Sequence, residues 1–220
     1  MPEPAVSTSY KNRLFAEREQ LILDAALRLF ARPDWQSVTV QTIAREAGIG
    51  KGTVYKHFRS KEEIYARLAL DFHSRMLARF HELADGLAGE PALRVIIRHA
   101  FESLLRDPAQ ANLSFYCKRV DFMECLPEDT RAAFEALDAG FSDFFAGVLA
   151  RFEPGRLPDL PADDMGILLE ATFDGALNML INRVVQTRAG MDQNRFLDLV
   201  CHYMIAGLTH LTPHTEAESQ

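Results

Sequence analysis

Apolar residues recur along most of the chain at intervals of three and four positions, the spacing of a helix that buries one face. The first clear stripe, which ends just before Pro33, consists of Ile22, Ala25, Ala26, Leu29 and Phe30. A second, shorter stripe spans Val40 to Ala47, and a third short helix is expected from about Lys51. No segment sustains the two-residue alternation of a strand, so the pattern predicts an all-α fold.

Longer amphipathic runs follow. One helix is expected from Lys61 to about Leu87, and prolines open three more, since proline is tolerated in a first helical turn: Pro91, Pro108 and Pro127. After a loop rich in Pro and Gly at 153–161, two last helices are expected, at about 162–188 and 192–211. The pattern predicts about nine helices in total.

The 220 residues are 48% hydrophobic and 25% charged, which is typical of a globular protein and excludes collagen-like, disordered and disulfide-scaffold chains. Three cysteines and an N-terminal segment without an apolar core favour a reducing cytoplasm over secretion. The longest segment free of charged residues, 199–215, is shorter than the roughly 20 apolar residues of a membrane span, so no membrane association is expected.

The charge is unevenly distributed. Residues 9–61 carry ten Lys and Arg against five Asp and Glu, whereas residues 66–220 carry fourteen against twenty-three. A basic N-terminal segment followed by an acidic remainder indicates a polyanion-binding part joined to a part with another task. A basic segment can also be a merely solvated surface, so charge alone does not decide the function.

Residues 37–58 have the outline of a helix-turn-helix, with two short helical patterns around a Gly-Ile-Gly turn. Thr39 is the expected N-cap of the first helix. Gly48 is expected to end that helix in the left-handed conformation. The small side chains of Ala44 and Ala47 would let the two helices cross closely. The second helix then exposes a set suited to nucleic acid: Lys51, Gly52, Thr53, Tyr55, Lys56 and His57.

With these residues the segment Arg18–Tyr65 resembles the DNA-binding domain of the TetR-type transcriptional regulators. Three parts of the chain carry the resemblance: Ile22-Leu23 through Phe30 with Trp35, Val38 through Ile49, and Lys51-Gly52-Thr53-Val54-Tyr55 with His57-Phe58 and Ser60 through Ile64. Two departures are visible, because Gly50 replaces the usual capping residue and Pro33-Asp34 replaces a glycine. Gly50 should leave the recognition helix poorly capped and mobile without DNA.

The resemblance implies a DNA-binding domain of three helices at 1–61, with residues 1–14 as a flexible arm, and a larger helical effector-binding and dimerisation domain at 62–220. It further implies a homodimer on a palindromic double-stranded operator, a repressor released by a small molecule, and no cofactor or enzymatic activity. The implied DNA contacts are Thr39, Gln41, Thr42, Lys51, Gly52, Thr53, Tyr55, Lys56, His57 and Lys61. Gln41 and Lys51 are the candidates for reading bases, and most of the others would position the phosphate backbone.

The last two predicted helices carry broad apolar stripes, which favour a four-helix interface between protomers over a purely intramolecular core. The expected interface residues are Phe173, Leu177, Leu180, Phe196, Val200, Tyr203, Met204 and Leu208. A pocket in the larger domain would favour an apolar or aromatic effector. Its candidate lining residues are Phe80, His99, Ser103, Phe115, Tyr116, Phe141, Phe145 and Phe173, although an aromatic stripe is more often plain core.

Other functions find little support in the sequence. No hydrolase or metalloprotease motif is present, and no histidine has metal-ligand spacing, so neither a metal site nor catalysis is expected. Cys117 and Cys125, eight residues apart on one expected helix, could sense redox state, but two buried thiols are the simpler interpretation. An activator, a regulator without an effector, and a helical enzyme or ligand carrier remain alternatives.

Overall fold

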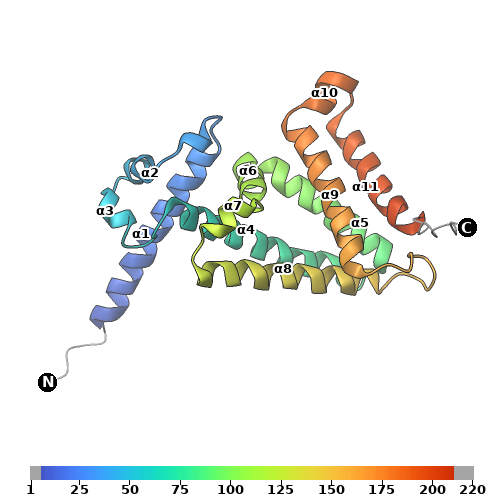
Figure 1. Ribbon diagram of the computed structural model, residues 1–220, viewed down its shortest axis with the longest axis horizontal. Coiled ribbons are helices and arrows are strands. Elements are labelled where there is room, and N and C mark those ends of the chain that lie inside the picture. Colours follow the sequence, from blue (N-terminus) through green and yellow to red (C-terminus); the bar gives the residue numbers. More distant parts are fainter. Residues whose placement is uncertain (1–5, 211–220) are drawn as a thin grey trace, which may run out of the picture. The chain divides into compact units, whose positions relative to one another are not determined.

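The structure is a computed structural model, and it describes residues 6–210 (Figure 1). Over these residues it contains no strand, which confirms the predicted all-α fold, but it has eleven α-helices instead of about nine. One 3₁₀-helix, η1, joins α1 to α2. The elements are α1 (Val6–Phe30), η1 (Trp35–Ser37), α2 (Val40–Glu46), α3 (Lys51–Val54), α4 (Lys61–Ala84), α5 (Gly89–Arg106), α6 (Pro108–Cys117), α7 (Val120–Glu124), α8 (Glu128–Leu149), α9 (Ala162–Ile181), α10 (Val184–Ala189) and α11 (Gln193–His210).

The chain forms two compact units. Unit 1 takes the chain up to Phe72 together with Asp107–Phe134, and unit 2 takes His73–Arg106 and the chain from Glu135 onward. These are units of packing, and the functional boundary predicted between residues 61 and 62 stays a prediction. Of the arm expected at 1–14, residues 6–14 are helical within α1, and residues 1–5 lie outside the described part of the chain.

In unit 1, α1 packs against α2 and α6. The predicted stripe of α1 is fully buried, including the alanines that allow close crossing: Ile22, Ala25, Ala26, Leu29 and Phe30. Ion pairs from Arg28 and Arg32 to Glu46, at 3.2 and 3.5 Å, add a polar connection between α1 and α2. Unit 1 therefore holds the helix-turn-helix on a close-packed aliphatic core.

An aromatic cluster completes unit 1. The ring of Phe30 stacks on Trp35 with centroids 4.8 Å apart and meets the edge of Tyr65 at 4.1 Å. Tyr116 of α6 contacts Trp35 at 5.4 Å and Phe122 of α7 at 5.2 Å. The Tyr65 hydroxyl is buried and has no hydrogen-bond partner. These rings connect α1, η1, α4, α6 and α7.

Unit 2 is built on α5, α9 and α11, which pack against one another. Large side chains from all three helices are fully buried: Leu93, Ile96, Leu177 and Leu197. Arg98 of α5 is paired with Glu102 on its own helix and with Asp198 on α11. The apolar faces of the last two long helices therefore supply much of the core of a single protomer.

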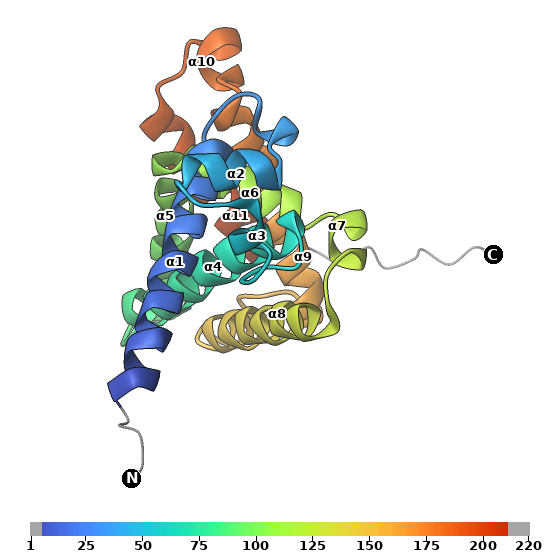
Figure 2. The same ribbon diagram turned by 90° about the vertical axis from the view of Figure 1, so that its left-hand side faces the viewer.

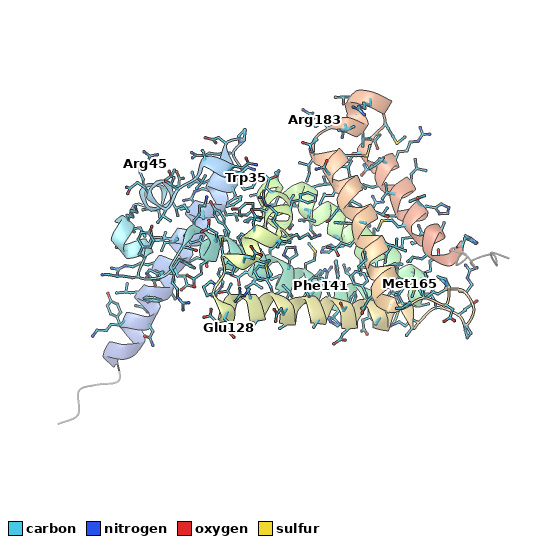
Figure 3. All side chains as sticks on the ribbon, viewed as in Figure 1. Trp35, Arg45, Glu128, Phe141, Met165 and Arg183 are labelled. Atoms are coloured by element: carbon cyan, nitrogen blue, oxygen red, sulfur yellow. The ribbon has the colours of Figure 1, made fainter. Side chains whose placement is uncertain are left out.

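A second aromatic cluster lies in unit 2, where α4 meets α5 and α8, and it includes Phe141, which Figure 3 labels. Phe80 of α4 is buried, and its ring centroid lies 5.8–6.4 Å from those of Phe141, Phe144 and Phe145 on α8. The His99 ring of α5 lies 6.3 Å from Phe80. Four of these five rings are phenylalanines.

The start of α5 is pinned to the end of α8. A Cβ atom on Gly89 would lie 2.1 Å from the Phe152 ring, so the ring occupies the space that any larger residue would need. The Gly89 amide donates to the Arg151 carbonyl at 3.2 Å, and the Arg151 guanidinium donates to the Ala84 carbonyl at 2.7 Å. Glycine is therefore required at position 89 by the close approach of the ring.

Two breaks account for the extra helices. The helix expected at about 162–188 ends at Ile181, because Arg183 adopts a left-handed φ of 56° before α10 begins. The helix expected to carry both Cys117 and Cys125 ends at Cys117, and Cys125 follows α7 as a separate C-cap. Neither break coincides with a glycine or proline, the residues by which breaks are predicted from sequence.

Candidate nucleic-acid interface

The helix-turn-helix has the predicted local structure. The Thr39 hydroxyl accepts a hydrogen bond from the Thr42 amide at 3.2 Å, which confirms Thr39 as the N-cap of α2. Gly48 has a φ of +69°, a left-handed conformation that glycine adopts without steric cost. The Ile49 amide then donates to the Ala44 carbonyl at 3.0 Å and closes the turn. These contacts fix the direction in which α3 leaves α2.

Helix α3, the second helix of the motif, is only four residues long, and Gly50 supplies no side-chain cap, as expected. Val54 anchors α3 in the core with no exposed surface. A Cβ atom on Gly52 would meet no atom within 4 Å, so this position faces open space. The backbone at Gly52 is therefore accessible to a flat or concave partner such as a DNA groove.

The predicted DNA-contact residues differ in exposure. Six of the ten are exposed, and five of these do not cap a helix and are accessible to a partner: Gln41, Lys51, Gly52, Tyr55 and Lys56. Thr42, Thr53, His57 and Lys61 are half-buried.

Two lysines lie over tyrosine rings, Lys51 at 5.8 Å from Tyr55 and Lys61 at 5.6 Å from Tyr65. The exposed Thr39 is already engaged as the cap of α2. The accessible surface thus combines ammonium, amide and phenol groups around the exposed backbone at Gly52. These groups are hydrogen-bond donors of the kind that bind phosphates and base edges.

His57 has a different environment from its predicted companions. Its ring stacks on Phe15 of α1 with centroids 3.9 Å apart and an interplanar angle of 31°, and its Nδ1 atom is buried without a partner. Burial lowers the pKa of His57, opposed by the charge of Glu19 and aided by that of Arg18. His57 therefore joins the segment that follows α3 to α1. Sequence reasoning missed this role because Phe15 lies far away in the chain.

The predicted effector-site residues fall into both units. Phe115 and Tyr116 belong to unit 1, where Tyr116 is part of the aromatic cluster. The other six lie in unit 2: Phe80, His99, Ser103, Phe141, Phe145 and Phe173. There His99 and Ser103 are hydrogen-bonded at 3.2 Å, and Phe173 stacks on Phe101 at 4.1 Å. Desolvation lowers the pKa of His99.

The predicted interface residues of α9 and α11 also divide by exposure. Leu177, Leu180, Met204 and Leu208 are buried within unit 2, and Phe173, Phe196 and Val200 are half-buried. Tyr203 is 68% exposed. Other large apolar side chains on these helices are exposed as well: Ile167, Leu168, Met179 and Leu199. We call Leu168, Met179, Leu199 and Tyr203 the exposed stripe.

The cysteines lie in contrasting surroundings. Cys117 is buried, and burial raises the pKa of its thiol to about 12, whereas Cys125 is exposed. A thiol with a raised pKa is a poor nucleophile and reacts slowly with oxidants. Within residues 6–210, no group of three or more His, Cys, Asp or Glu side chains is placed to hold a metal ion. No helix in the same range is long and apolar enough to cross a membrane.

Residues 22–68 match the family model described as "Bacterial regulatory proteins, tetR family". Residues 22–68 therefore belong to the TetR family of regulators. The match covers residues 22–30 at the end of α1, the helix-turn-helix and the first turns of α4, which are the elements whose geometry is described above. The chain is a DNA-binding transcriptional regulator, and the relatives that match it are regulators, not enzymes.

Relatives agree with this assignment. The HTH-type transcriptional repressor KstR2 of Rhodococcus jostii is 28% identical over 149 residues, which are 67% of this chain and 69% of KstR2. The regulator AcrR of Shigella flexneri is 32% identical over 93 residues, 41% of this chain and 43% of AcrR. The solved structure of FadR from Bacillus subtilis in complex with stearoyl-CoA has a TM-score of 0.64 at 19% identity and covers 86% of this chain and 98% of that one. The last similarity shows the fold.

Proposed function

We propose that the protein is a homodimeric repressor that binds a palindromic operator and is released by a small apolar or aromatic effector. The observation that carries the proposal is the accessible surface of α3, where Lys51, Tyr55 and Lys56 surround the open position at Gly52. A regulator of this kind acts where the DNA is, so we expect it in the cytoplasm. Activation instead of repression would use the same DNA contacts.

The exposed stripe supports dimerisation. Leu168 and Met179 on α9 flank the small residues Ala171 and Gly175, and Leu199 and Tyr203 on α11 are followed by the exposed Gly207. Large residues alternating with small ones on two neighbouring helices let a second pair of helices approach closely. A monomer would leave these side chains in water, so we assign the dimer interface to this stripe.

The composition of unit 2 supports an apolar effector. Phe141 and Phe145 are half-buried beside the buried Phe80. His99, which is hydrogen-bonded to Ser103, and His81 place polar atoms beside the rings of this aromatic cluster. The fold is shared with FadR, whose solved complex contains stearoyl-CoA. Long-chain acyl-CoA thioesters are therefore the first effector class to test, and planar aromatic compounds are the second.

The DNA experiment is a pull-down of genomic fragments by the purified full-length chain at near-physiological salt. A single enriched palindrome is the expected result. Lys51→Ala should then weaken binding to that fragment by about 1–3 kcal/mol, while Arg75→Ala, which removes a positive charge from the exposed middle of α4, leaves binding unchanged. Equal binding by both variants would refute the assigned recognition surface.

Dimerisation is tested by sedimentation of Tyr203→Glu, which places a charge in the middle of the exposed stripe. We expect monomers at concentrations where the wild-type chain is dimeric. Ser142→Glu, on the exposed side of α8, adds the same charge elsewhere in unit 2 and should leave the dimer intact. A dimeric Tyr203→Glu protein would remove the exposed stripe from the interface.

The effector is tested by adding stearoyl-CoA or a planar aromatic compound to the complex with the enriched DNA fragment. Release of the DNA by one of the two classes, and not by free coenzyme A, is the expected result. Retention of the complex with both would contradict an apolar effector.

A further inference from the structure

The N-terminal part of α1 extends the DNA-binding unit beyond the part that the family model matches. Helix α1 begins at Val6, whereas the matched segment begins at residue 22, where the buried residues of α1 also begin. Figures 1 and 2 show this part of the helix continuing past α2 and α3. We call residues 10–21 the α1 extension. Its large apolar side chains are half exposed, Tyr10 at 53%, Phe15 at 48% and Leu21 at 50%.

Specific contacts hold the α1 extension beside α3 and the residues that follow it. The Phe15 ring stacks on His57, which lies three residues after the end of α3. Glu19 pairs with Arg67 of α4 at 3.5 Å, within unit 1. A helix of this length is marginally stable alone. Its continuity with the buried part of α1 and these two contacts therefore fix both its conformation and its position.

The side of the α1 extension nearest to His57 carries unneutralised positive charge. Lys11 and Arg18 lie four residues before and three residues after Phe15, so all three share one helix face. Both cations are exposed, and neither forms an ion pair with any residue of the described part of the chain. Arg13, in contrast, pairs with Glu17 at 3.6 Å. Glu19, the carboxylate on this side, pairs with Arg67, which also pairs with Asp71.

We propose that the α1 extension is a second DNA-contacting element, in which Lys11 and Arg18 bind backbone phosphates next to those reached from α3. The stack of Phe15 on His57 positions it, so His57 is a positioning residue and not a direct DNA contact. The partner is duplex DNA because the charged face continues a surface already suited to it. The proposal rests on the proposed function, since it requires the same protein–DNA complex.

Salt dependence gives the decisive measurement. The probe is the genomic duplex enriched by the wild-type chain, and its affinity is measured by fluorescence anisotropy over a series of potassium chloride concentrations. The slope of log affinity against log salt counts phosphate contacts, and each lost contact makes it shallower by about 0.9. The Lys11→Ala/Arg18→Ala variant should lose about that amount for each contact and bind more weakly. Arg13→Ala, whose charge is neutralised by Glu17, should keep the wild-type slope.

The positioning role of the stack has its own readout. Phe15→Ala keeps every charge but frees the α1 extension from His57, so it should lower the affinity. If Phe15 acts by positioning the two cations, they contribute little once Phe15 is removed. The Lys11→Ala/Arg18→Ala pair should then weaken DNA binding much less in a Phe15→Ala background than in the wild-type chain. Full additivity of the two effects would overturn the positioning role. Circular dichroism of each variant checks that α1 remains helical.

The outcomes separate the two proposals. A Lys11→Ala/Arg18→Ala variant with wild-type affinity and slope, while Lys51→Ala still loses binding, overturns the second element and leaves the proposed function standing. A wild-type chain that binds no duplex overturns both. If the double variant keeps its DNA affinity but no longer binds vesicles of anionic phospholipid that the wild-type chain binds, the charged face belongs to a membrane surface, which also overturns the proposal.

Discussion

The two units each contain an aromatic cluster, but the clusters are built differently. In unit 1, Phe30, Trp35, Tyr65, Tyr116 and Phe122 come from five separate elements, and three of the five rings carry a polar atom. In unit 2, the cluster around Phe80 is mostly phenylalanine, and three of its rings come from α8 alone. The first arrangement fixes many short segments at once, whereas the second joins a few long helices. Unit 1 should therefore tolerate less change in its rings than unit 2.

The largest effect should come from removing the central ring of unit 1. Phe30 is fully buried and contacts Trp35 and Tyr65, so Phe30→Ala should lower the free energy of unfolding by about 3–5 kcal/mol. The half-buried Phe141 of unit 2 is the comparison, and Phe141→Leu should cost less than about 1.5 kcal/mol. Urea denaturation followed by circular dichroism measures both. Similar losses in the two variants would contradict the difference between the clusters.

Substitutions in the turn between α2 and α3 test whether the backbone of unit 1 tolerates as little change as its rings. Gly48→Ala forces a Cβ atom into the left-handed region and should cost about 1–2 kcal/mol of unfolding free energy. Gly52→Ala meets no neighbouring atom and should keep or slightly raise stability, since alanine favours helices. On the enriched duplex, however, Gly52→Ala should bind more weakly because its methyl group stands where DNA approaches. Thermal unfolding and anisotropy separate the two effects.

A smaller effect, an increase in stability, is expected from a substitution at Tyr65. Its hydroxyl is buried without a partner, and burial raises the pKa of Tyr65 far above its ordinary value, so the group adds a desolvation cost. Tyr65→Phe keeps the ring contacts to Phe30 and Tyr116 and should raise stability by up to about 1 kcal/mol. A clear loss of stability in urea would mean that the hydroxyl contributes a bond in solution.

The smallest effect is a dependence on pH that both units share. Burial lowers the pKa of His57 in unit 1 and of His99 in unit 2, so below the ordinary histidine pKa of 6.5 the unfolded chain binds protons more readily than the folded one. The free energy of unfolding should thus be highest above about pH 7. It should fall as the pH drops through 6.5 toward the lower pKa values that the two histidines have in the folded chain. His57→Gln and His99→Gln should each reduce this fall in melting temperature, and the exposed His202→Gln should not. A fall unchanged in both variants would rule out these two histidines as its source.

The helix-turn-helix could be predicted from sequence because its determinants are local. Thr39 caps the helix that it precedes, and Gly48 takes a backbone conformation that few residues other than glycine accept. Unit 2 has such signals at helix ends, such as the Asp192 carboxylate that caps α11, but they do not reveal how its helices pack. Periodicity finds the apolar stripes of α9 and α11 but cannot tell which edge faces inward, and the buried Met204 is adjacent to the exposed Tyr203. The stack of Phe15 on His57 joins segments distant in the chain, which a single sequence does not reveal, and no glycine or proline marks the break at Arg183.

The ring of Phe152 in the place of a Cβ atom on Gly89 has a consequence for the evolution of the protein. The two positions are 63 residues apart in the chain, yet Gly89 cannot be replaced by a larger residue while Phe152 is retained. A relative with alanine at the first position needs a smaller residue at the second, and the intermediate with alanine and phenylalanine together passes through a steric clash. Substitutions at the two sites should therefore appear in descendants as a pair, in an order that begins with loss of the ring.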